Sequence, residues 1–187
     1  MGGPKALLRI GDESFLARVC RLLAGAGIES VVAVVGAEAA RVQAEAGMPA
    51  GVRVAVNEAW RDGMLSSVWH GLDAAEALAA EAVLLHPVDN PLVAPATIEA
   101  VVLALARGAE IAVPSHGGRR GHPAGFARAT WPALRAAPAD EGAKAVLARD
   151  PGRVVHVPAG EDCLVDLDSP RDVVEARRVR ADWTPAS

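Results

Sequence analysis

The sequence of 187 residues has few aromatic side chains, few cysteines and no excess of positive charge. Phe, Trp and Tyr make up 3% of the chain and Tyr is absent, so a core must be built from Ala, Val and Leu, as in α/β proteins with buried strands. Lys and Arg total 19 against 23 Asp and Glu, a formal net charge of −4. This balance disfavours a general nucleic-acid binder.

The two cysteines, Cys20 and Cys163, lie far apart, and neither has a second cysteine two to four positions away. This spacing indicates neither a zinc site nor a disulfide framework, and we expect a reduced, cytoplasmic protein. Cys20 follows a helical pattern and is interpreted as a small buried hydrophobe rather than a nucleophile. The apolar runs are short, and none approaches the roughly 20 residues of a membrane span.

Segments of helical and strand character alternate along the chain. Helical spacing covers 14–28, 38–46, 66–80, 94–107, 130–136 and 141–148. Strand character covers 30–36, 52–57, 82–87, 110–114, 124–126, 153–157 and 164–168, and Ser169-Pro170 opens a last helix. The alternation predicts a three-layer α/β/α fold with a mostly parallel, Rossmann-like sheet. We expect a single domain over 1–182 and a tail at 183–187.

Acidic side chains follow two of the apolar runs, where ligands bind in open parallel sheets. Asp89 lies between two prolines after the run 82–85, and Asp166 and Asp168 alternate at the end of the predicted strand 164–168. Carboxylates held by rigid turns or paired on one strand face are suited to a magnesium-phosphate site. A turn or helix-capping role is the alternative for all three.

Three further features combine polar residues with glycine. The stretch from Asn57 to Ser67 leads from a strand into a helix, and its two serines could cap that helix. The glycine-rich, basic stretch 115–123 is predicted to be a loop that either forms part of a site or is simply solvated. Lys5 follows Gly-Gly-Pro, where a lysine could reach a phosphate or remain in solvent.

Taken together and in order, these motifs resemble the molybdenum-cofactor cytidylyltransferase group of the nucleotidyltransferases. The matching stretches are Met1 to Leu8 (M-G-G-P-K-A-L-L), Asn57 to Ser67 (N-x-x-W-x-x-G-M-x-S-S), Pro87 to Val93 (P-V-D-N-P-L-V), Gly118 to Pro123 (G-R-R-G-H-P), Asp140 to Lys144 (D-E-G-A-K) and Asp166 to Asp172 (D-L-D-S-P-R-D). The G-H-P element is similar to the cytidylyl branch rather than the guanylyl branch. The resemblance covers nearly the whole chain and implies the GT-A-like fold of nucleotide-diphospho-sugar transferases.

The resemblance also implies a role for each matching residue. Lys5 and Asp89 are the expected catalytic residues, with Lys5 on the triphosphate. The expected nucleotide-binding residues are Gly2, Gly3, Lys5, Asn57, Gly63, Ser66 and Ser67. The expected ligands of Mg²⁺ are Asp89, Asp166 and Asp168, and the expected contacts to the pterin substrate or its phosphate are Arg119, Gly121 and His122.

The implied reaction transfers CMP from CTP to the molybdopterin form of the molybdenum cofactor and releases pyrophosphate. Two alternatives stay open: a guanylyltransferase that uses GTP or another phosphorylated acceptor, and a non-catalytic cofactor carrier for a molybdenum hydroxylase. A hydroxylase is also a possible partner of the enzyme, whereas nucleic acid and membrane are not expected partners.

The sequence departs from the family at its amino end. The family begins with a hydrophobic strand and an L-A-A-G or L-A-G-G phosphate loop, and here Met1 falls after both. We therefore expect this form of the domain to lack its first strand, which belongs in the centre of the sheet, and to bind nucleotide weakly.

Overall fold

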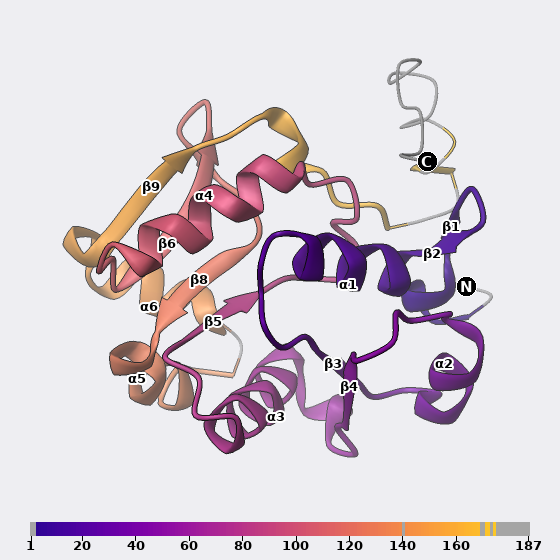
Figure 1. Ribbon diagram of the computed structural model, residues 1–187. Coiled ribbons are helices and arrows are strands. Elements are labelled where there is room, and N and C mark those ends of the chain that lie inside the picture. The colour runs from indigo at the N-terminus through magenta and orange to yellow at the C-terminus, as the bar shows by residue number, and fades with distance from the viewer. Residues whose placement is uncertain (1–2, 140, 169–170, 173, 175–187) are drawn as a thin grey trace.

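The computed structural model describes residues 3–139, 141–168, 171–172 and 174 (Figure 1). Helices lie on both sides of the strands. α1 (Phe15–Gly25) and α4 (Pro95–Ala106) share an apolar cluster with β5 (Ala82–Leu85) on one face, and α3 (Met64–Ala77) packs on the other face. The three-layer α/β/α arrangement predicted from the alternating pattern is thus confirmed.

The first half of the chain forms a small parallel sheet. α1 begins after Ser14, whose side-chain oxygen accepts a hydrogen bond from the Ala17 N–H at 3.0 Å. The chain then forms β3 (Val32–Val35), α2 (Ala39–Glu45) and β4 (Arg53–Val56), and β3 pairs with β4 in parallel. These elements lie inside the segments expected from the sequence.

The second half forms a larger, mixed sheet. β8 (Ala124–Ala127) lies antiparallel between β5 and β6 (Ile111–His116), so β5 and β6 share one direction, and β9 (Val154–Pro158) runs parallel to β6. The shared direction of β5, β6 and β9 agrees with the predicted mostly parallel sheet. β8 runs against them because the connection from β6 is too short for a crossover.

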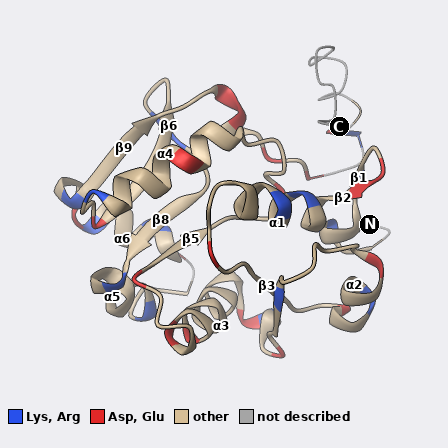
Figure 2. Cartoon of the chain, in the orientation of Figure 1, with Lys and Arg blue, Asp and Glu red and all other residues tan. Residues whose placement is uncertain are grey.

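The remaining elements are short. They are β1 (Arg9–Ile10), β2 (Glu13–Ser14), β7 (Arg119–Arg120), α5 (Trp131–Arg135), α6 (Ala143–Arg149) and 3₁₀ turns at Lys5–Leu7, Trp60–Asp62, Arg128–Thr130, Pro151–Arg153 and Glu161–Leu164. No helix in the described ranges is both long enough and apolar enough to span a membrane. Figure 2 shows Lys and Arg distributed over several elements, including α1, α2 and α5, rather than gathered on one.

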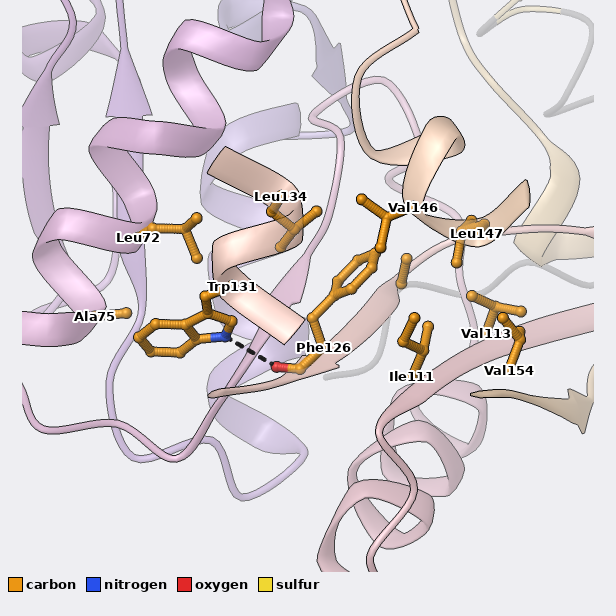
Figure 3. Close-up of a cluster of buried hydrophobic side chains, with 11 residues drawn as sticks. Leu72, Ala75, Ile111, Val113, Phe126, Trp131, Leu134, Val146, Leu147 and Val154 are labelled. Carbon is orange, nitrogen blue, oxygen red and sulfur yellow. Dashed lines mark hydrogen bonds between the residues drawn. The ribbon is translucent and has the colours of Figure 1, made fainter. Parts of the chain in front are cut away.

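The largest apolar cluster lies between the mixed sheet and α3, α5 and α6 (Figure 3). Two aromatic residues, Phe126 and Trp131, are at its centre, and the Trp131 indole N–H donates to the Phe126 carbonyl at 3.2 Å. The other members are aliphatic, among them Leu72, Leu134 and Ile111. The core is therefore aliphatic for the most part, as expected from the shortage of aromatic residues.

β3 and β5 belong to separate sheets, and no described strand pairs with both. α1 shares an apolar cluster with each strand: Cys20 belongs to the same cluster as the β3 residue Val35, and Leu22 to the same cluster as the β5 residue Leu84. The expected strand before Met1 stays a prediction, as does the single domain over 1–182. The expected tail at 183–187 lies outside the described residues.

Two local predictions are wrong. Residues 164–168 form no strand: a 3₁₀ turn ends at Leu164, and the following chain bonds to the turn that carries Asp89 instead of to a strand. The stretch 115–123 is not a simple loop, because β6 continues to His116 and forms a hairpin with β7. Gly117 and Gly118, with φ of 56° and 78°, form the tight turn of this hairpin.

Candidate active site

Lys5 lies between two carboxylates that come from distant parts of the chain. Its Nζ is 2.9 Å from Oδ2 of Asp89 and 2.5 Å from Oδ1 of Asp168. The side chain of Lys5 is 39% exposed, that of Asp89 25% and that of Asp168 69%, so the cluster opens to solvent on the Asp168 side. The structure thus brings together three residues that the sequence analysis selected separately.

The two carboxylates keep Lys5 charged. The hydrogen bond to Asp168, followed by the hydrogen bond to Asp89, raises the pKa of the Lys5 ammonium above its ordinary value. Lys5 begins a 3₁₀ turn that follows Pro4, which holds an extended conformation. A permanent positive charge at this place is suited to phosphate oxygens.

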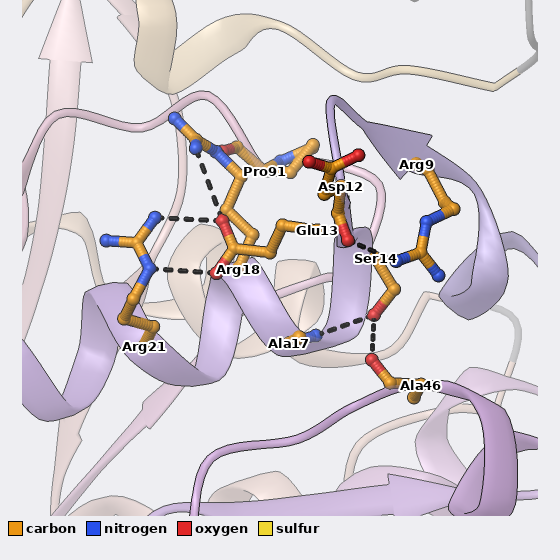
Figure 4. A network of polar contacts seen from close by, with 9 residues as sticks. All are labelled: Arg9, Asp12, Glu13, Ser14, Ala17, Arg18, Arg21, Ala46 and Pro91. Carbon is orange, nitrogen blue, oxygen red and sulfur yellow. Dashed lines mark hydrogen bonds and ion pairs between the residues drawn. The ribbon is translucent and has the colours of Figure 1, made fainter. Parts of the chain in front are cut away.

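The turn that carries Asp89 is fixed from two directions. His86 donates its Nε2–H to the carbonyl of Asn90 at 2.9 Å, and Arg18 of α1 donates its Nε–H to the carbonyl of Pro91 at 2.8 Å. Figure 4 shows Arg18 next to Glu13. Asp89 therefore lies on a braced turn at the carboxyl end of β5, as the sequence predicted.

Arg18 is itself held in a small network of charges (Figure 4). Glu13 contacts Arg18 at 3.5 Å and forms two hydrogen bonds with Arg21, at 2.8 and 2.9 Å. The hydrogen bond from Arg21 is the main cause that lowers the pKa of the Glu13 carboxyl. Ser14 also contacts the carbonyl of Ala46, which connects the start of α1 to the end of α2.

A second set of hydrogen bonds joins the Asp89 turn to the segment that carries Asp166 and Asp168. The Asn90 side-chain N–H donates to the Val165 carbonyl at 2.7 Å, and the Leu167 N–H donates to the Asp89 carbonyl at 2.6 Å. Asn90 is fully buried. These bonds hold Asp89 and Asp168 near each other independently of Lys5.

Two histidines lie close to the carboxylates. Burial lowers the pKa of His86 to about 4, and it lowers the pKa of His122 as well, although Asp166 and Asp89 oppose the shift in His122. Because Nε2 of His86 is the donor to Asn90, its Nδ1 is a bare acceptor, and it is buried without a partner in the described chain, as is Nδ1 of His122. Both shifts favour the neutral form of the ring.

The expected magnesium ligands are only partly brought together. Within the described ranges, no group of three or more His, Cys, Asp or Glu side chains has a geometry that could hold a metal ion. Asp89 and Asp168 share Lys5, whereas Asp166 is exposed and interacts with His122. Mg²⁺ commonly binds one or two carboxylates together with substrate phosphates, so the pair Asp89 and Asp168, which here shares the cationic group of Lys5, fits such an ion once Lys5 has moved away.

Asn57 connects the end of β4 to the start of α3. Its side-chain N–H groups donate to Ser66 at 2.8 Å and to Ser67 at 3.0 Å, and Asn57 is fully buried. α3 begins at Met64 after Gly63, so the interpretation of the serines as caps at the helix start is wrong. Gly63 has a φ of 102°, a conformation that favours glycine.

The expected substrate-binding residues have different environments. Arg119 is exposed on β7, and His122 is half-buried near Asp89 and Asp166. Gly121 is buried, and a Cβ at this position would lie 2.3 Å from the Cys163 carbonyl oxygen. Gly121 is thus required for close backbone packing.

The glycines expected on the triphosphate lie at the start of the chain. Gly2 falls outside the described residues. Gly3 is exposed and has a φ of 150°, and a Cβ there would lie 3.6 Å from the guanidinium of Arg41. Their predicted contact with nucleotide stays a prediction.

Three supporting residues were not selected from the sequence. Arg18 and Asn90 brace the Asp89 turn, and Asp162 accepts a hydrogen bond from the Ala94 N–H just before α4, at 2.7 Å. Asn90 lies inside the P-V-D-N-P-L-V motif, and this position could have indicated its role from the sequence. Arg18 and Asp162 act through backbone groups that are distant in sequence, which no local pattern indicates.

Comparison with known proteins agrees with this geometry. The sequence profile described as "MobA-like NTP transferase domain" matches residues 1–154, most of the chain. The chain belongs to the MobA-like NTP transferase family. It is therefore a nucleotidyltransferase by family. A sequence search of curated proteins finds no match.

Several solved structures resemble this MobA-like chain. Rv0371c from Mycobacterium tuberculosis is 27% identical, with a TM-score of 0.74 over 96% of this chain and 89% of that one. A structure of Rv0371c in complex with manganese is 26% identical, with a TM-score of 0.69 over 96% and 92% of the two chains. A nucleotidyl transferase from Methanothermobacter, 21% identical, has a TM-score of 0.77 over 94% and 84%, and supports the fold alone.

Proposed function

We propose that the protein is a magnesium-dependent cytidylyltransferase that transfers CMP from CTP to the terminal phosphate of a molybdopterin-type cofactor. The arrangement of Lys5 between Asp89 and Asp168 supports this proposal most directly. It places a permanent positive charge and two carboxylates at the carboxyl end of β5, where ligands bind in folds of this class.

Direct transfer suits the side chains around this site. A phosphate oxygen of the acceptor attacks the α-phosphorus of CTP, the bond between the α-phosphorus and the bridging oxygen breaks, and pyrophosphate leaves with the electron pair. No protein nucleophile is needed, and both cysteines are buried, with the pKa of Cys20 raised to about 11 by burial. Catalysis then depends on positioning and on positive charge.

Each residue of the site has a role in this proposal. Lys5 binds the triphosphate and stabilises the negative charge that develops on pyrophosphate. Asp89 and Asp168 hold Mg²⁺, which supplies further positive charge to the phosphate oxygens when it is bound. Ser67 and the backbone at Gly63 lie next to the base and ribose of the nucleotide, whereas His122 and Arg119 face the acceptor.

Pyrophosphate release tests the proposal. The protein is incubated with Mg²⁺, molybdenum-loaded molybdopterin and either CTP or GTP. We expect release from CTP, and a loss of at least about a hundredfold in Asp89→Asn, because the variant loses a carboxylate that would hold Mg²⁺ beside the phosphates. Asp73→Asn is the control, since Asp73 is exposed and pairs with Arg135 on the surface.

The other outcomes identify the alternatives. Faster release from GTP than from CTP would make the protein a guanylyltransferase. Binding of the molybdenum cofactor without nucleotide turnover, unchanged in Asp89→Asn, would make it a carrier. Equal pyrophosphate release from the two aspartate variants would remove the proposed role of Asp89. A molybdenum hydroxylase that accepts the product is the proposed partner.

A further inference from the structure

The ammonium group of Lys5 lies where a cation shared by two carboxylates would lie. It is 2.9 Å from Asp89 and 2.5 Å from Asp168, close enough to neutralise both. The two acidic segments do not depend on Lys5 for their proximity, since the bonds from Asn90 to Val165 and from Leu167 to Asp89 already connect them. Without Lys5, the two negative charges would remain neighbours and would repel each other.

We propose that Lys5 is an exchangeable counter-cation, which neutralises Asp89 and Asp168 in the nucleotide-free protein and gives way to a divalent metal ion when a triphosphate binds. This inference rests on the proposed function, because it concerns the same site. It also predicts that the divalent ion binds tightly only together with the triphosphate. The nucleotide-free protein binds a divalent ion weakly, and the triphosphate draws Lys5 onto its own oxygens as the ion binds the carboxylates.

The physical reason is that Lys5 and a divalent ion compete for the same two carboxylates. An ammonium group and a divalent ion repel each other strongly at short distance, so Lys5 and the metal cannot both lie between Asp89 and Asp168. Lys5 has a flexible four-carbon stem and is 39% exposed, so it can move to a nearby anion without disturbing the core. Phosphate oxygens bind an ammonium group as well as carboxylates do.

A purely structural salt bridge predicts a different result. Exposed ion pairs add little stability. If Lys5 only joins two segments, its removal would loosen Asp168 and would leave metal affinity unchanged or lower. If Lys5 competes with the metal, its removal would raise the affinity of the nucleotide-free protein for the metal.

The test measures binding of Mn²⁺ alone to the nucleotide-free protein, from the decrease of the free Mn²⁺ signal in electron paramagnetic resonance. We expect Lys5→Met to bind Mn²⁺ about tenfold more tightly than the wild type, because one positive charge next to both ligands is gone. Lys5→Arg keeps the charge, and we expect its affinity to stay close to that of the wild type. Arg107→Met removes one charge from an exposed position at the end of α4 and controls for net charge.

Asp89→Asn in combination with Lys5→Met shows where the ion binds, and the tighter binding should disappear in the double variant. Affinity in Lys5→Met that is equal to or below that of the wild type overturns the inference, as does an equal gain in Arg107→Met. This failure is distinct from failure of the proposed function. Pyrophosphate release that depends on Asp89 can persist while Lys5→Met gains no Mn²⁺ affinity, and the gain can occur in a protein that turns over no CTP.

Discussion

The side chain of Asn90 donates a hydrogen bond to the carbonyl of Val165, 75 positions later in the chain, at 2.7 Å. This bond connects the turn that carries Asp89 to the segment that carries Asp168. Asn90 is fully buried, so the donor side of this bond is shielded from solvent. The relative position of the two carboxylates around Lys5 therefore depends on a side chain that does not touch Lys5 itself.

Replacement of Asn90 by alanine tests this dependence. We expect Asn90→Ala to lower the free energy of unfolding by about 1–3 kcal/mol, because the partly buried Val165 carbonyl loses its donor. Loss of the unpartnered Oδ1 of Asn90 offsets part of this effect. Urea unfolding measures the change. Gln43→Ala removes an exposed amide that bonds within α2 at 3.3 Å, and should change stability by less than about 0.5 kcal/mol. Equal effects of the two substitutions would contradict the role of Asn90.

Two glycine substitutions should change the stability of the protein in opposite directions. A Cβ on Gly121 would lie 2.3 Å from the Cys163 carbonyl oxygen and 2.6 Å from its sulfur, so Gly121→Ala should destabilise the protein by about 1–3 kcal/mol. Gly25 ends α1 with no atom within 4 Å of a new Cβ. Gly25→Ala should stabilise by about 0.5–1 kcal/mol. Thermal unfolding of both variants checks the signs, and a destabilising Gly25→Ala would show that the packing around α1 is misassigned.

Substitutions of the two serines of α3 should differ in their effects on stability and on nucleotide binding. Ser66 is buried and contacts the carbonyl of Gly63 as well as Asn57, so Ser66→Ala should lower stability by about 1–2 kcal/mol. Ser67 accepts a hydrogen bond from Asn57, and its own hydroxyl proton has no acceptor among the described residues.

We therefore expect Ser67→Ala to weaken CTP binding about fivefold and to lower stability less than Ser66→Ala, because Asn57 loses one acceptor in each variant but only Ser66 also donates to Gly63. Calorimetry with CTP and urea unfolding measure the two effects. CTP affinity that is unchanged in Ser67→Ala would remove Ser67 from the nucleotide site.

The sequence predicted the site where a local pattern determines the structure. Asp89 could be placed because an apolar run followed by Pro-Val-Asp-Asn-Pro is typical of a strand and a tight turn. The strand expected at 164–168 was wrong, because Val165 and Leu167 use their backbone groups on the Asp89 turn. The alternation of apolar residues in that segment is equally compatible with an extended chain that pairs with a turn. Its contact with Lys5 depends on tertiary structure.

The strand directions in the sheet also depend on tertiary structure. The apolar runs and their helical neighbours predicted strands and layers, but the direction of β8 depends on the hairpin formed by β6 and β7, which the basic composition of 115–123 obscured. Gly121 was selected as a substrate contact, and its close approach to Cys163 could be found only from the folded backbone.

Cys20 should make stability depend on alkaline pH. Burial raises the pKa of its thiol from 9.0 to about 11, so the fold favours the neutral thiol. This stabilisation is complete below pH 9 and is lost as the pH rises from 9 to about 11, where the unfolded thiol ionises first. No tyrosine titrates in this range, since the chain has none.

In urea unfolding at pH 8 to 11, Cys20→Ala should be less stable than the wild type at pH 8 because it leaves a small cavity, and the difference should shrink as the pH rises. A difference that stays constant up to pH 11 would show that the thiol is not shielded from solvent.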